Sequence, residues 1–202
     1  NSGLYIHIPF CKSKCRYCDF NSFANRETDI EPYFYALNNE ISAWSKKLDG
    51  RQFDTVYFGG GTPSFVDPAV LCECIRHIQN CFLLSPDCEI TVECNPGTIG
   101  FDGLASLKKA GVNRLSIGLQ STDNQTLSEL GRIHTVNDFE ECLAAARCVG
   151  FKNISLDLMY SLPDMTMEKW EQTLEKAVLY HPQHISAYAL KIEDGTPFSI
   201  LH

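Results

Sequence analysis

A repeated alternation of short apolar strands and amphipathic helices dominates this chain of 202 residues and limits the folds open to it. Six segments are rich in Ile, Val, Leu, Tyr and Phe and are bounded by Gly, Pro, Asn or Asp, as β-strands are. They span residues 4–10, 55–60, 89–95, 114–120, 153–160 and 184–190. Strands that alternate with helices form βαβ units and a parallel sheet with right-handed crossovers. We therefore predict an α/β fold, either an open doubly wound sheet or an incomplete barrel.

Apolar residues at helical spacing predict an amphipathic helix after most of these strands. Asp67 and Pro68 fit an N-cap and a first-turn proline, and Gly111, Gly131 and Gly150 fit helix ends. The apolar stripes are Phe34, Leu37, Ile41, Trp44 and Leu48; Leu71, Ile75, Ile78 and Phe82; Leu104 and Leu107; Leu127 and Leu130; Phe139, Cys142, Leu143 and Ala146; and Trp170, Leu174, Ala177 and Val178. No linker divides the chain, so we predict one domain over residues 1–202.

Charge and composition exclude several classes of protein. The net charge of −8 argues against general nucleic-acid binding, which requires a basic surface to displace counterions. No apolar run approaches the roughly 20 residues of a transmembrane helix, and no secretory signal is present, so we expect a cytoplasmic protein. The start without Met and the end at His202, soon after the sixth strand, indicate a piece of a longer protein whose C-terminal domain is missing.

Three of the ten cysteines, Cys11, Cys15 and Cys18, follow the first strand on one short loop. Cysteines in a reducing compartment are more often metal ligands or buried thiols than disulfides, and thiolates suit zinc and iron–sulfur clusters. A structural zinc site requires four ligands. Cys72 and Cys74 do not complete one easily, because residues two apart on a helix face different ways. Three cysteines on a cubane cluster leave one iron open. Three unrelated buried thiols and a zinc-stapled α/β module are the alternatives.

Polar residues at the ends of successive strands predict a ligand pocket. Residues 59–63, Gly-Gly-Gly-Thr-Pro, let the backbone approach a ligand, although a tight strand-to-helix turn also explains them. Glu93 can pair with an ammonium group, Gln120 and Asp157 suit ribose hydroxyls, and Arg132 suits a carboxylate. Singly, each is explained as a solvated or capping residue. Together they fall where parallel α/β folds bind ligands, at the carboxyl ends of the strands.

Several motifs resemble those of the radical S-adenosylmethionine (SAM) superfamily. The cysteine spacing, with an aromatic residue before Cys18, is similar to the superfamily's cluster motif. The segments at 5–11, 58–64, 93–98, 115–121 and 184–190 resemble one branch, which contains the oxygen-independent coproporphyrinogen oxidase HemN and its relative HemW. The match covers nearly the whole chain.

The resemblance implies a fold, cofactors and site residues. The fold is an incomplete (β/α)6 TIM-like barrel with parallel strands and outer helices, forming the radical SAM core domain. Cys11, Cys15 and Cys18 would hold a 4Fe-4S cluster whose open iron is chelated by SAM, and one electron from the cluster would cleave the sulfonium. The residues implied for the cofactor pocket are Tyr5, Tyr17, Gly60, Gly61, Thr62, Glu93, Gln120, Arg132 and Asp157.

The resemblance leaves a chaperone and an enzyme in competition. In the oxidase a further cysteine stands two residues after the third cluster ligand, whereas this chain has Phe20. We expect Phe20 to pack the cluster loop against the barrel and exclude water. HemW is regarded as a haem chaperone, which is the reading we favour over a porphyrinogen-decarboxylating oxidase. The implied partners are haem or a porphyrin, a reductant protein of the flavodoxin or ferredoxin type, and an apoprotein that accepts haem.

The remaining cysteines and histidines have simpler roles. Cys94 follows Glu93 on a strand, and alternation predicts that the two side chains point to opposite faces. We expect His7 to be structural rather than a ligand, and the sequence does not identify which residue would ligate haem. The cysteines predicted to be partly buried thiols are Cys72, Cys74, Cys81, Cys88, Cys142 and Cys148.

Overall fold

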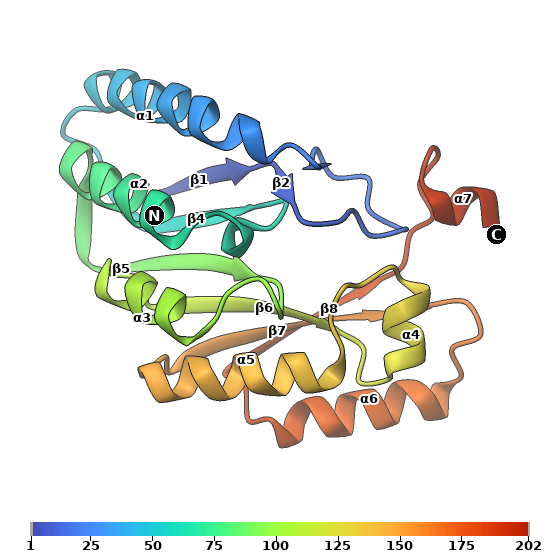
Figure 1. Cartoon of the computed structure of the whole chain (residues 1–202). Coiled ribbons are helices and arrows are strands. Elements are labelled where there is room, and N and C mark those ends of the chain that lie inside the picture. The colour runs from blue at the N-terminus through green and yellow to red at the C-terminus, as the bar shows by residue number, and fades with distance from the viewer. Residues whose placement is uncertain (1, 202) are drawn as a thin grey trace.

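The computed structural model describes residues 2–201, and its centre is a six-stranded parallel sheet (Figure 1). The strands are β1 (Gly3–Ile8), β4 (Gln52–Gly60), β5 (Leu83–Cys94), β6 (Arg114–Gln120), β7 (Asn153–Tyr160) and β8 (His184–Ala189). Their order in the sheet is their order along the chain. A doubly wound sheet reverses this order at a switch point, whereas here the order never reverses. Between residues 2 and 201 no pairing joins β8 back to β1, so the fold is an incomplete barrel.

Five helices connect the strands and cover the outer side of the sheet (Figure 1). They are α1 (Ile30–Lys47), α2 (Pro68–Cys81), α3 (Phe101–Lys109), α5 (Val136–Val149) and α6 (Met167–Leu179). The shorter elements are β2 (Phe10–Cys11), β3 (Phe23–Ala24), η1 (Glu27–Asp29), η2 (Pro63–Phe65), α4 (Asn124–Glu129) and α7 (Pro197–Leu201). A sheet wound in one direction by right-handed crossovers places its connecting helices on one side, which leaves the inner face free for a ligand.

The predicted helix caps are confirmed. The Asp67 carboxylate accepts a hydrogen bond from the Ala69 amide at 2.8 Å, and Pro68 occupies the first turn of α2. Gly150 ends α5 with a φ of 98°, a left-handed conformation that glycine adopts without strain. These local signals set where each helix begins and ends relative to the strand ends.

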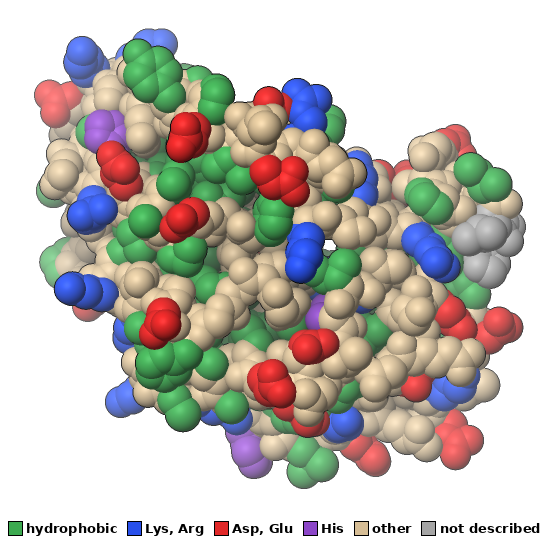
Figure 2. Space-filling view, in the orientation of Figure 1, with side chains coloured by type: hydrophobic (Ala, Val, Ile, Leu, Met, Phe, Trp, Pro, Cys, Tyr) green, Lys and Arg blue, Asp and Glu red, His purple; other side chains and the backbone are tan. Residues whose placement is uncertain are grey.

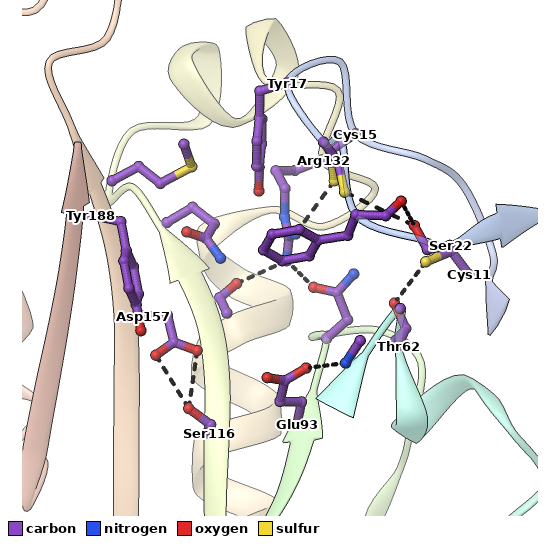
Figure 3. A pocket seen from close by; sticks show the side chains of 18 of the residues that line it. Cys11, Cys15, Tyr17, Ser22, Thr62, Glu93, Ser116, Arg132, Asp157 and Tyr188 are labelled. Carbon is purple, nitrogen blue, oxygen red and sulfur yellow. Dashed lines mark hydrogen bonds between the residues drawn. The ribbon is translucent and has the colours of Figure 1, made fainter. Parts of the chain in front are cut away.

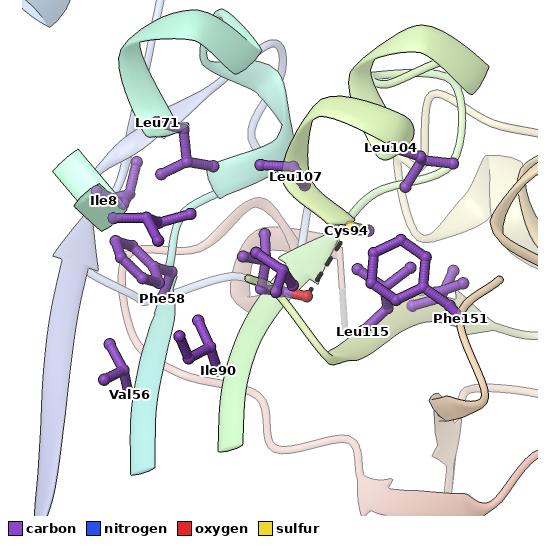
Figure 4. Packing of buried hydrophobic residues seen from close by; sticks show 14 of the residues in the cluster. Ile8, Val56, Phe58, Leu71, Ile90, Cys94, Leu104, Leu107, Leu115 and Phe151 are labelled. Carbon is purple, nitrogen blue, oxygen red and sulfur yellow. Dashed lines mark hydrogen bonds between the residues drawn. The ribbon is translucent and has the colours of Figure 1, made fainter. Parts of the chain in front are cut away.

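Alternation along the strands divides the sheet into an apolar outer face and a polar inner face. The outer face packs against the helices through fully buried residues such as Phe58, Leu71, Leu104 and Leu115 (Figure 4). Burying one such side chain contributes about 1.5–3 kcal/mol. Cys94 lies in this core, as predicted. The apolar residues thus fix the sheet from one side and leave the polar residues of the other side for a site.

Some predicted boundaries and faces are wrong. The first strand ends at Ile8 because Pro9 has no amide to donate, and Phe10 and Cys11 form a separate bridge, β2, with β3. Trp44 was expected on the buried stripe of α1 but is 48% exposed. Its indole bonds to Glu40, and Lys47 lies over its ring, which holds it on the solvent side. Val178, expected in the stripe of α6, is also exposed.

The outer surface is mixed in charge. On the face shown in Figure 2, acidic and basic side chains are interspersed, with apolar side chains between them. Across residues 2–201 no helix has the length and apolar character needed to span a bilayer.

Candidate functional site

A cavity of about 680 Å³ lies at the carboxyl ends of the strands, on the inner face of the open barrel (Figure 3). Its lining combines the loop that carries the three cysteines with residues from the ends of β4 to β8. Cys11, Cys15 and Cys18 all line it. So do all the residues expected in the cofactor pocket except Tyr5: Tyr17, Gly60, Gly61, Thr62, Glu93, Gln120, Arg132 and Asp157. Tyr5 lies at the open edge of β1, 59% exposed, with its ring stacked on Tyr57.

The three cysteines each meet a different polar group. Cys11 is buried on β2, where its Sγ accepts a hydrogen bond from Thr62 Oγ1 at 3.5 Å. Cys15 Sγ accepts one from Arg132 Nη1 at 3.5 Å, and Cys18 Sγ lies 3.9 Å from Ser22 Oγ. Hydrogen bonds to sulfur stabilise thiolates and tune the clusters that they hold.

Backbone contacts fold the cysteine loop onto the barrel. The Phe23 amide donates to the Pro9 carbonyl at 2.7 Å, which closes the loop at its base. The Lys14 ammonium donates to the carbonyls of Phe20 and Ser22 at 3.0 and 3.2 Å. The Arg16 amide donates to the Leu130 carbonyl and ties the loop to the end of α4. These hydrogen bonds hold the loop at its base and against α4 without the help of a metal.

The donor set fits a cluster better than a single ion. In the described part of the chain no three Cys, His, Asp or Glu side chains are grouped to hold one metal ion. A cubane does not need that grouping, because each of its irons takes a separate thiolate. Cys72 and Cys74 are buried with α2 in the outer core, and burial raises the pKa of the Cys74 thiol to about 12. Neither lines the cavity, so the zinc alternative gains no fourth ligand from them.

Protein groups occupy the space that a side chain would need at each of the three glycines at the end of β4. A Cβ on Gly59 would lie 2.9 Å from Glu93 Oε1, and one on Gly60 would lie 2.5 Å from the His7 ring. A Cβ on Gly61 would lie 2.8 Å from the Phe10 carbonyl oxygen. Gly60 also has a φ of 115°, which other residues rarely adopt. The three glycines therefore bring β4 close to β1, β2 and Glu93, while Gly60 and Gly61 also line the cavity.

Glu93 projects from β5 into the cavity with both oxygens bonded. Tyr57 Oη donates to Oε1 at 2.8 Å, and the Gly60 amide donates to Oε2 at 3.1 Å. Burial raises the pKa of the carboxyl, and these two hydrogen bonds oppose the rise. A cationic ligand group beside Glu93 would favour the ionised form.

Asp157 lies across the cavity on β7. It accepts a hydrogen bond from Ser116, the residue two positions before Gly118 on the neighbouring strand β6. Burial raises the pKa of this carboxyl too, while the hydroxyls of Ser116 and Ser186 oppose the rise. The cavity thus contains two partly buried carboxylates, which are held by uncharged hydroxyl and amide donors.

Arg132 joins the cysteine loop to the sheet. Its guanidinium donates to Asn95 Oδ1, to the Gly118 carbonyl at 3.0 Å and to Cys15 Sγ. Its Nε is buried without a hydrogen-bond partner among the described residues. Buried polar atoms are rarely left unpaired in a native protein, so this donor points to a ligand or water that completes it. Near it Gln120 has a φ of 64°, a strained conformation of the kind that occurs at binding sites.

The sequence analysis missed several side chains of the cavity, among them Tyr57 and Ser116. Tyr57 precedes Gly59 by two residues, and Ser116 precedes Gly118 by two, so strand alternation places each on the inner face. That signal was present in the sequence, because the same alternation separates Glu93 from Cys94. Phe20 was expected to pack against the barrel, but it is 64% exposed at the cavity lining. The loop is held by its backbone and by Lys14, so this ring is not needed for packing.

Comparison with known proteins identifies the family of this chain. A family model described as the radical SAM superfamily matches residues 5–177. The heme chaperone HemW of Escherichia coli is 39% identical over 197 residues, which cover 97% of this chain and 52% of that protein. The mitochondrial radical S-adenosyl methionine domain-containing protein 1 of Mus musculus is 37% identical, with 96% and 44% covered.

A solved structure has the same fold. Coproporphyrinogen III oxidase (HemN) from Escherichia coli, a radical SAM enzyme, superimposes with a TM-score of 0.87 at 29% identity. The superposition covers 96% of this chain and 48% of that one. The chain therefore spans about half the length of the curated relatives that it matches.

Proposed function

Because the chain belongs to the radical SAM superfamily, for which a 4Fe-4S cluster and SAM are implied, we propose that Cys11, Cys15 and Cys18 hold the cluster. The observation that carries the proposal is that these thiols line the same cavity as two partly buried carboxylates, Glu93 and Asp157. When bound, the cluster supplies one electron for cleavage of the sulfonium of SAM. We assign residues 1–202 to the radical SAM core domain.

The cavity residues divide by the part of SAM that each suits. Glu93 pairs with the methionyl ammonium, since a buried carboxylate is stabilised by an opposite charge. Asp157 and Gln120 bond the ribose hydroxyls. Arg132 directs its unpaired Nε to the methionyl carboxylate. Tyr17 and the backbone of residues 60–62 line the cavity between these side chains. The Tyr5 ring stacks on Tyr57.

We propose that the protein acts as a haem chaperone in the cytoplasm. Curated relatives named heme chaperone HemW are 37–39% identical to nearly all of this chain. Phe20 stands at the cavity where the oxidase has a further cysteine, and a phenyl ring cannot donate a proton or a hydrogen atom as a thiol can. A reductant protein would supply the electron, and an apoprotein would accept the haem.

The oxidase is the second candidate, favoured by the superposition on HemN. Anaerobic reconstitution of the complete chain, followed by separate incubation with haem and with coproporphyrinogen, separates the two. We expect a shift in the haem absorbance spectrum and no loss of carbon dioxide from the propionates, as followed by product mass. Several turnovers to protoporphyrinogen would instead identify an oxidase. The cluster assignment is independent of this outcome, since it rests on the three cysteines.

A further inference from the structure

Tyr57 is a partly buried partner of Glu93 and is not among the residues proposed above to contact SAM. It lies on the inner face of β4, and its hydroxyl donates to Glu93 Oε1 at 2.8 Å. The Gly60 amide holds the other oxygen, Oε2, at 3.1 Å. With one donor on each oxygen, the carboxylate cannot rotate without losing a hydrogen bond. Its outward direction is therefore fixed before a ligand arrives.

Two neighbours fix the position of the Tyr57 ring. A Cβ on Gly59 would lie 2.8 Å from Tyr57 Cε1 and 2.9 Å from Glu93 Oε1, so glycine at this position leaves the room that the pair needs. On the other side the ring stacks on Tyr5, with centroids 6.1 Å apart and planes at 20°. The hydroxyl is therefore held at Glu93 by packing as well as by its hydrogen bond.

We propose that Tyr57 is a positioning residue, which fixes the Glu93 carboxylate toward the cationic end of the ligand bound in the cavity. This inference rests on the proposed pairing of Glu93 with the ammonium group of SAM. Tyr57 does not itself need to touch the ligand. It restricts the conformations of the Glu93 side chain before the ligand arrives, so less conformational entropy is lost when the ligand binds.

The electrostatics of the pair give the inference a measurable consequence. Burial raises the pKa of Glu93, Asp157 across the cavity raises it further, and His7 on β1 lowers it. The Tyr57 hydroxyl bonds the ionised form and so also lowers it. Glu93 in turn raises the pKa of Tyr5. Removing the hydroxyl should raise the pKa of Glu93, and binding of a cation should then weaken most at acid pH.

The test is the Tyr57→Phe variant of the complete, reconstituted chain, which keeps the ring and loses only the hydroxyl. We expect SAM to bind about tenfold more weakly near pH 6, with a smaller loss near pH 8 and unchanged iron content. In the protein without SAM, the ¹³C signal of the Glu93 carboxyl should titrate at higher pH than in the wild type. Glu93→Gln identifies that signal by removing it. Tyr180→Phe is the matched control, since Tyr180 bonds Glu140 at 2.6 Å on the outer surface.

The outcomes separate this inference from the proposed function. If Tyr57→Phe binds and titrates as the wild type does while Glu93→Gln binds weakly, the positioning role is wrong and the pocket assignment stands. An equal loss at every pH with an unchanged Glu93 titration also overturns it. If Glu93→Gln binds SAM normally, the pocket assignment itself fails. Should Tyr57→Phe not fold, difluorotyrosine at position 57 strengthens the donor, and the Glu93 titration should then move to lower pH.

Discussion

The hydroxyl of Ser116 on β6 lies 3.2 Å from Oδ1 and 3.0 Å from Oδ2 of Asp157 on β7 (Figure 3). Ser116 is only 4% exposed, so water does not replace this donor easily. The Ser186 hydroxyl on β8 also favours the ionised form of Asp157. Hydroxyls from the two flanking strands therefore orient one carboxylate toward the cavity.

Replacing Ser116 by Ala should weaken SAM binding by about tenfold, because a buried carboxylate loses one charged hydrogen bond. Iron content should not change, since Ser116 lies well apart from Cys11 and Cys15 (Figure 3). Isothermal titration of the reconstituted protein measures the affinity. Ser106→Ala is the control, as the Ser106 hydroxyl bonds the Asp102 carbonyl on the exposed side of α3. Equal affinities in the two variants would contradict the role given to Asp157.

Replacing Cys11, Cys15 or Cys18 by Ala should abolish the broad visible absorbance of a thiolate-ligated iron–sulfur cluster. The three are on one loop at the cavity, whereas Cys72 and Cys142 are buried in the outer core. Variants of those two should therefore retain the cluster after anaerobic reconstitution. A Cys15→Ala protein with full iron and sulfide content would show that the cluster assignment is wrong.

Gly61→Ala should disrupt cluster binding although Gly61 is not a metal ligand. Its Cβ would lie 2.8 Å from the Phe10 carbonyl and 2.9 Å from the Ile8 carbonyl, and backbone cannot give way as a side chain can. The strand that carries Cys11 must then move. Gly100→Ala is the matched control, because a Cβ at Gly100 would meet nothing within 4 Å. We expect iron content to fall in the first variant and to be retained in the second. Retention in both would mean that β2 tolerates the displacement.

Much of the fold and site follows from local patterns. Period-two alternation separates Glu93 from Cys94, and the strand-end rule collects the cavity residues, since parallel strands end at one edge. Periodicity could not choose between a doubly wound sheet and a barrel, because the two differ only in which strands are neighbours. That choice came from the family resemblance, and the strand order confirms it.

Other features depend on contacts that no local pattern contains. The glycines of residues 59–61 are also required by the protein itself, since a Cβ there would meet Glu93, His7 or the Phe10 carbonyl, and no local pattern shows these neighbours. Phe20 was expected to pack against the barrel, yet its ring is exposed, and Lys14 holds the loop through the Phe20 carbonyl. Exposure on a loop is set by neighbours distant in sequence.

Glu93→Gln should change how the stability of the protein depends on pH. The folded-state pKa of Glu93 is raised by burial, so folding favours the protonated form. Its contribution to the free energy of unfolding is therefore fully present below the unfolded-state pKa, for which 4.5 is the reference value, and is lost as the pH rises through the folded-state pKa.

In the Gln variant this part of the pH dependence should disappear. Urea unfolding of the cluster-free chain at a series of pH values measures it, because metal would add its own binding energy. At acid pH the variant should be the less stable protein. Tyr57 and Gly60 each donate to one oxygen of Glu93, whereas Gln has a single acceptor oxygen and places its NH2 group, itself a donor, against the other of the two. That mismatch costs about 1–3 kcal/mol. The same variant should bind SAM at least tenfold more weakly at neutral pH. Parallel stability curves for wild type and variant would show that Glu93 does not titrate differently in the folded state, and would remove the electrostatic reason for its affinity for a cation.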